Sequence, residues 1–97
     1  LTFHGYLPIV KRERIQKLKS LDAEVSRSGY TQIFMETPYR NQQLLDDVLK
    51  TCTTNHKLCI AVDITLQSEQ IRTLAVAEWK TQKIDLHKRP CMFLLGQ

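Results

Sequence analysis

Glu36 and Arg40 are the residues whose types and spacing best suit binding in this sequence. They flank Thr37-Pro38-Tyr39, directly after a short apolar run, where a strand would give way to a helix. Ligands of open α/β sheets bind beyond the carboxyl ends of the strands, and arginine is unfavourable near a helix N-terminus. A ligand could therefore explain the pair, but so could an ordinary ion pair, and the residues alone leave both interpretations open.

Other groupings of reactive side chains are weaker candidates for a metal site or an active site. Cys52, His56 and Cys59 are close enough in sequence for zinc, but both cysteines fall in apolar core patterns and no fourth ligand has a familiar spacing. Nothing resembles a nucleophile elbow, and three scattered glycines do not make a phosphate-binding loop. We therefore expect no catalytic residue and no metal site within this chain.

Composition and charge indicate a soluble domain. The 97 residues allow one core, with 42% hydrophobic and 25% charged residues, and no apolar run is long enough for a membrane span. Three cysteines without a close pair argue against a disulfide framework and for the cytoplasm. The formal charge of +4 suits phosphate-bearing partners without reaching the level typical of nucleic-acid binders.

The first residues indicate a piece of a longer protein. The chain starts at Leu1, without Met, and residues 2–6 already have the pattern of structured, extended chain. We therefore expect another domain to precede this one.

Helical and strand patterns alternate along the chain. A first helix is predicted over residues 10–26, closed by Gly29. A second is predicted from Thr37, its N-cap, through Cys52. A third is predicted over residues 74–80. Strands are predicted over residues 30–35, 57–64, 70–72 and 91–95. The alternation predicts a single α/β domain with a mixed sheet of about five strands flanked by helices, at least part of it parallel.

The helix over residues 10–26 is rich in basic residues. They crowd its first half, at Lys11, Arg12, Arg14, Lys17 and Lys19. Such a face is usually only solvated, although contact with RNA or an anionic substrate is the alternative.

Five segments in order resemble the C-terminal domain of tetrapyrrole-methylase-fold methyltransferases, most closely the bacterial 16S rRNA cytidine 2′-O-methyltransferases. Residues 3–8 (FHGYLP) and 33–40 (IFMETPYR) resemble that family's F-x-G-F-L-P and I-F-Y-E-S-P-H-R. Residues 58–65 (LCIAVDIT), 72–74 (RTL) and 93–96 (FLLG) resemble its later motifs. The resemblance covers nearly the whole chain.

The resemblance implies a two-domain enzyme that uses S-adenosylmethionine. An N-terminal domain, absent from this sequence, would hold most of the cofactor, and residues 1–97 would form one wall of the cleft and be inactive alone. The resemblance also implies a homodimer. The cofactor- and substrate-binding residues that it implies are Glu36, Thr37, Pro38, Tyr39, Arg40, Asp63 and Thr65.

Departures from the family motifs leave the methyl acceptor open. Val62 and Leu66 replace two basic residues, and Tyr39 replaces a histidine, which weakens the match to an RNA substrate in particular. The acceptor could be a ribose hydroxyl of rRNA or a carbon of a tetrapyrrole. A non-catalytic module that binds RNA or protein is the alternative from another functional class.

Overall fold

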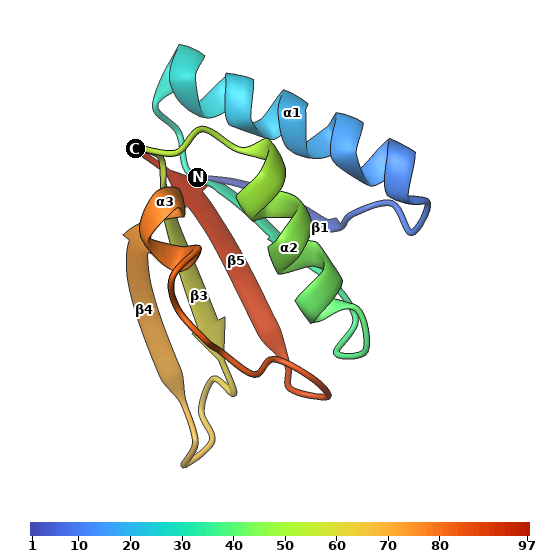
Figure 1. Cartoon of the computed structure of the whole chain (residues 1–97), viewed down its shortest axis with the longest axis vertical. Coiled ribbons are helices and arrows are strands. Elements are labelled where there is room, and N and C mark those ends of the chain that lie inside the picture. The colour runs from blue at the N-terminus through green and yellow to red at the C-terminus, as the bar shows by residue number, and fades with distance from the viewer.

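A computed structural model describes all of residues 1–97 and contains one five-stranded sheet with three helices (Figure 1). The elements in chain order are β1 (Thr2–Tyr6), α1 (Lys11–Ser28), β2 (Gln32–Met35), α2 (Asn41–Thr51), β3 (Lys57–Val62), β4 (Gln70–Ala75), α3 (Val76–Trp79) and β5 (Cys91–Gly96). The strand order is β1-β2-β5-β3-β4, parallel only between β1 and β2 and antiparallel elsewhere. The predicted α/β fold with a five-stranded mixed sheet is confirmed.

The helices cover one face of the sheet. Alternate strand residues point to this face, and Phe34 and Phe93 stack there with ring centroids 5.8 Å apart. Leu18, Leu44 and Trp79 from the three helices are buried against them. This single apolar layer is the core.

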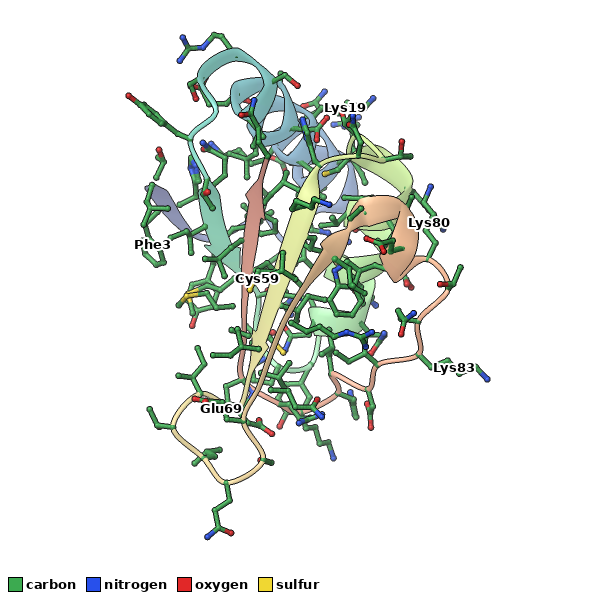
Figure 2. The ribbon with its side chains drawn as sticks, turned by 90° about the vertical axis from the view of Figure 1, so that its left-hand side faces the viewer. Phe3, Lys19, Cys59, Glu69, Lys80 and Lys83 are labelled. Carbon is green, nitrogen blue, oxygen red and sulfur yellow. The ribbon has the colours of Figure 1, made fainter.

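The opposite face of the sheet carries apolar side chains but no helix. The strand pairing places one row of residues across all five strands of this face: Phe3, Ile33, Leu94, Cys59 and Thr73. Figure 2 shows Phe3 and Cys59 with no helix in front of them. Phe3 is 62% exposed, so the row is open to its surroundings at the β1 edge.

Helix α1 ends as predicted but differs in its basic face. Gly29 adopts φ 76°, the left-handed conformation that closes a helix. Arg14 was expected among the exposed basic residues, yet it is buried and bonded to Asp47 of α2. A charge can be buried where a partner carboxylate faces it, which the sequence pattern of one helix does not reveal. None of the three helices is both long and apolar enough to cross a membrane.

Helix α2 starts later than predicted. Thr37 was expected as its N-cap, but the helix begins at Asn41 and residues 38–40 form a turn closed by a bond from Arg40 N to Thr37 O. The Glu36 carboxylate accepts the Thr37 backbone N–H at 2.7 Å, a local bond that competes with a helical start.

The region after β3 also differs from the prediction. The expected short strand 70–72 extends to Ala75 because it pairs with β3 over the full length of that strand. The expected helix 74–80 is reduced to α3 for the same reason, since long-range pairing overrides local helix propensity.

Candidate functional site at the β2–α2 junction

Four loops meet at one edge of the sheet. β1, β2 and β3 run in the same direction, so their carboxyl ends share this edge, where β4 and β5 begin (Figure 1). The loops cover residues 7–10, 36–40, 63–69 and 80–90. This is the edge at which α/β sheets bind ligands, and all seven predicted site residues lie on it.

Glu36 is the centre of the site. Its side chain is 1% exposed, and its Oε1 accepts the Thr37 N–H at 2.7 Å. Arg40 Nε lies 3.3 Å from the same oxygen, within ion-pair distance but without the geometry of a hydrogen bond. The predicted pair of residues therefore exists, and its carboxylate is held in the interior with few donors.

Buried side-chain polar atoms without a hydrogen-bond partner are confined to this junction. They are Glu36 Oε2, Thr37 Oγ1, Arg40 Nε and Asn41 Oδ1. A native fold leaves few such atoms, and each calls for an explanation. The four atoms belong to residues 36–41, and local departures from complete polar satisfaction are expected at functional sites.

A pocket of about 400 Å³ opens beside these atoms. It is lined by two segments that are far apart in sequence, residues 6–9 after β1 and Glu36, Thr37 and Arg40 after β2. Leu7 is buried and hydrogen-bonded from its N–H to Met35 O, which fixes the first segment against the second. The volume is in the range of small-molecule sites.

Asp63 forms a second polar group, at the end of β3. Its Oδ2 accepts bonds from Ser68 Oγ at 2.8 Å and from Arg89 Nε at 2.9 Å. The Ser68 hydroxyl first, and then Arg89, hold the pKa of Asp63 below its usual value, although desolvation opposes them. This carboxylate is well satisfied, unlike that of Glu36.

The 88–90 segment joins the two groups. β5 lies between β2 and β3, so Asp63, which follows β3, is separated from Glu36 by one strand. Lys88 N donates to Pro38 O at 3.1 Å, and Asn41 Nδ2 to Arg89 O at 2.6 Å. Arg89 then reaches Asp63, so the connection is made through the loop before β5.

The remaining predicted residues are less well connected. Tyr39 is exposed and meets only the His87 ring, edge-on with centroids 6.2 Å apart. Thr65 is exposed, its N–H is bonded to Glu69, and no bond joins it to Glu36 or Arg40. Its φ of 71° is unusual for a β-branched residue, and Asp63 and Lys88 at the same edge are also left-handed. Such strain concentrates at functional sites.

Sequence reasoning missed Asn41, Ser68 and Arg89. Arg89 supplies a cation at the edge where the two family basic positions, Val62 and Leu66, are apolar. The only available signal was its position before Pro90 and the last strand, which does not reveal a contact across the sheet.

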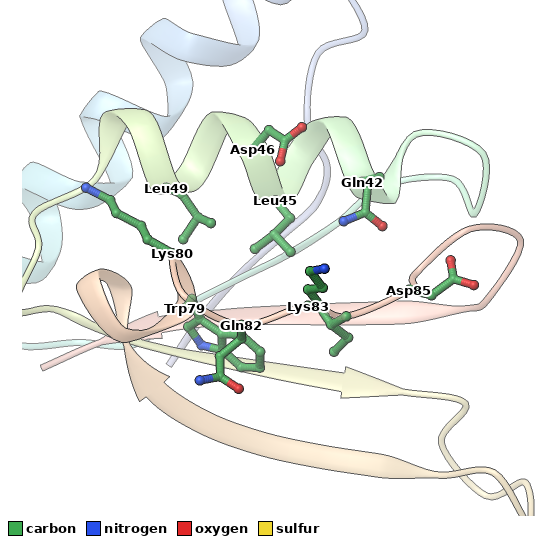
Figure 3. Close-up of a pocket in the computed structure, with 10 residues that line it drawn as sticks. Gln42, Leu45, Asp46, Leu49, Trp79, Lys80, Gln82, Lys83 and Asp85 are labelled. Atoms are coloured by element: carbon green, nitrogen blue, oxygen red, sulfur yellow. The ribbon is translucent and has the colours of Figure 1, made fainter.

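A larger pocket, of about 600 Å³, lies elsewhere, between α2 and residues 79–85 (Figure 3). The side chains around it include Asp46, Lys80 and Lys83, which are exposed, and Trp79, whose Nε1 already donates to Leu58 O. No unpartnered buried atom faces it. We therefore place the site at Glu36 and not in the larger pocket.

His56 has partners that the sequence did not reveal. Its Nδ1 lies 2.7 Å from Asp22 Oδ1 and its Nε2 3.2 Å from Ser26 Oγ. The arrangement of Asp22, His56 and Ser26 resembles a serine triad. However, Ser26 lies within α1, where backbone N–H groups bond within the helix and are not free to form an oxyanion hole. Asp22 also accepts two bonds from Thr53, so the cluster ties α1 to the loop before β3.

The cysteines are separated in the fold. Cys52 is buried in the core, where desolvation and then Asp22 raise the pKa of its thiol to about 12, whereas Cys59 lies on the uncovered sheet face. Burial also raises the pKa of Cys91 to about 11. No three His, Cys, Asp or Glu side chains are grouped as metal ligands.

Comparisons with known proteins give a likeness of structure only. No family model matches the sequence, and no curated protein matches it. The crystal structure of the methyltransferase CobJ matches all of this chain with a TM-score of 0.56 at 12% identity. The chain spans 41% of the length of CobJ. The chain thus shares the fold of part of a methyltransferase, in agreement with the predicted tetrapyrrole-methylase C-terminal fold.

Proposed function

We propose that residues 1–97 form the C-terminal domain of an S-adenosylmethionine-dependent methyltransferase of the tetrapyrrole-methylase superfamily. The carrying observation is that the two segments with the clearest family motifs, residues 3–8 and 33–40, converge on one pocket with unsatisfied polar atoms. The length of CobJ leaves room for a further domain, which we propose holds most of the cofactor.

The residues of the site suit a positioning role. S-adenosylmethionine supplies an electrophilic methyl group on a sulfonium, so the transfer needs alignment and an oriented acceptor, not a covalent protein residue. Glu36 and Thr37, which line the pocket, carry unsatisfied polar atoms that can bind and orient a ligand, and Leu7 and Pro8 exclude water from one side. Asp63 and Arg89 hold the loop behind them.

We propose a ribose hydroxyl of small-subunit rRNA as the acceptor and a cytoplasmic homodimer as the working form. The exposed Lys11, Arg12 and Lys19 on α1 support an anionic partner. The same residues would serve a non-catalytic RNA-binding module, which is the second candidate.

Labelled methyl transfer tests the proposal. The full-length protein that carries this chain is incubated with labelled S-adenosylmethionine and either small ribosomal subunits or a precorrin. We expect label in rRNA. Label only in the tetrapyrrole would exclude the RNA acceptor, and RNA binding without any transfer would favour the non-catalytic module.

The isolated chain gives a second test. Residues 1–97 alone should bind S-adenosylmethionine too weakly for calorimetry to detect, because the chain would supply only one wall of the cleft. Micromolar binding by this chain would contradict the division of the cofactor site between two domains.

A further inference from the structure

The polar atoms of the β2–α2 pocket are mostly hydrogen-bond acceptors. Glu36 Oε2 can only accept, and Thr37 Oγ1 can accept or donate. Glu36 is more than nine-tenths buried. A ligand that satisfies these atoms must therefore present N–H or O–H donors, and an anion would be opposed by the Glu36 carboxylate.

Arg40 is the present neighbour of this carboxylate, but it is a poor partner. Its Nε contact with Glu36 at 3.3 Å lacks hydrogen-bond geometry, and its side chain is 32% exposed. Arg40 is half-buried and makes no side-chain hydrogen bond with Glu36, so little holds it against turning outward into water. A ligand donor can then reach the carboxylate that Arg40 now covers.

The walls of the pocket indicate the shape of the ligand. Tyr6, Leu7 and Pro8 contribute apolar and aromatic side chains to the lining of the pocket that Glu36 shares, and Tyr6 is 64% exposed. A flat heteroaromatic ring can stack on such a surface while its edge donates to a carboxylate. The volume of about 400 Å³ is adequate for one ring system of this kind.

We propose that Glu36 binds the exocyclic amino group of a nucleobase, which takes the place of Arg40. The inference deepens the proposed function, because adenine of the cofactor and cytosine of an RNA substrate share this chemistry. Its test measures binding alone and does not depend on methyl transfer.

The test uses two pairs of nucleosides that differ at one group. Cytidine and adenosine carry the amino group, whereas zebularine and purine riboside carry only a hydrogen at the same ring position and keep the neighbouring ring nitrogen as an acceptor. Each is titrated at millimolar concentration into the isotope-labelled 97-residue chain, and the amide signals of residues 36–41 are followed. The amino member of at least one pair should bind about ten-fold more tightly, the effect of one hydrogen bond to a charged group. The preferred pair distinguishes adenine from cytosine.

Two variants test whether Glu36 is the source of the preference for the amino group. Glu36→Gln should reduce it to less than about three-fold, because a neutral amide oxygen accepts a weaker hydrogen bond from the amino group than a carboxylate does. Glu13→Gln, a matched change on the exposed surface of α1, should keep it. Equal binding within both pairs, a preference that survives Glu36→Gln, no binding of any nucleoside, or stronger shifts with inorganic phosphate would each overturn the proposal. Methyl transfer without the preference would leave the proposed function intact.

Discussion

At Glu36 the fold holds a carboxylate in its interior with a single well-formed hydrogen bond, from Thr37 N. A buried charge with so few partners opposes folding, because its lost hydration is not replaced. Natural proteins keep such groups where function requires them. The cost of this arrangement can be measured.

Glu36→Gln should make the chain more stable, by about 1 kcal/mol in the free energy of unfolding. The neutral amide keeps an acceptor for the Thr37 N–H and removes the buried charge, while Arg40 remains able to reach water. Urea denaturation at neutral pH measures the change, with Glu13→Gln as the control. A marked loss of stability would show that the Glu36–Arg40 pair is structural.

Asp63 should contribute to the pH dependence of stability. Its pKa is lowered in the folded chain, by Ser68 first and then Arg89, so its ionised form is favoured by folding. The contribution is therefore present above the usual aspartate pKa and is lost as the pH falls through the lower, folded value.

Asp63→Asn should thus lower the urea midpoint at pH 7 and have a smaller effect at pH 2. Ser68→Ala should give the same pattern, because it removes the largest cause of the lowered pKa. Asp46→Asn is the control, since Asp46 is exposed and makes no hydrogen bond or ion pair. If Asp63→Asn lowered the urea midpoint equally at both pH values, the charge of Asp63 would not be the source of its contribution to stability.

At the scale of elements, α1 and α2 are joined by a buried ion pair. Arg14 Nε lies 2.7 Å from Asp47 Oδ2, and both side chains are at most 5% exposed. Arg14 Nη1 also donates to Ile9 O at 3.0 Å, in the loop that lines the pocket. The pair therefore holds both the helix packing and one wall of the site.

Arg14→Met should cost about 3 kcal/mol of stability, because it leaves the buried Asp47 without its hydrogen-bonded partner and with only the exposed Lys11 Nζ, at 3.8 Å. The double variant Arg14→Met/Asp47→Leu should recover most of this loss, since well-packed apolar residues can replace a buried pair. A double-mutant cycle measures this, with urea denaturation of the wild type, both single variants and the double variant. Additive losses in the double variant would contradict a direct interaction.

The elements also show how far the sequence alone could predict this fold. The helical pattern of α2 and the end of α1 at Gly29 depend on neighbouring residues in the sequence, and both were predicted from it. The β4–α3 boundary depends on pairing with β3, and the burial of Arg14 depends on Asp47, so neither follows from a local window. Glu36 and Arg40 were identified from the junction they occupy, whereas Arg89 joins the site only through the folding of a distant loop.

At the scale of the whole molecule, one face of the sheet carries apolar side chains that the chain's own helices do not cover. The row across this face is apolar on four strands and ends at Thr73 on β4, where Ile71, paired with Ala61, is 60% exposed. Large exposed apolar surfaces of this kind mark interaction sites. The other face is already filled by the helices.

We expect the 97-residue chain to self-associate through this face, with a second copy covering it. Sedimentation equilibrium should show an average mass that rises with concentration, and more so in salt, which screens the net charge of +4. Phe3→Glu/Ile71→Glu should remain folded, because both side chains are largely exposed, but should sediment as a monomer. Tyr30→Glu is the control, because Tyr30 is 62% exposed but lies in the loop between α1 and β2. A wild-type chain that stays monomeric, or a Tyr30→Glu variant that dissociates as well, would contradict association through the sheet face.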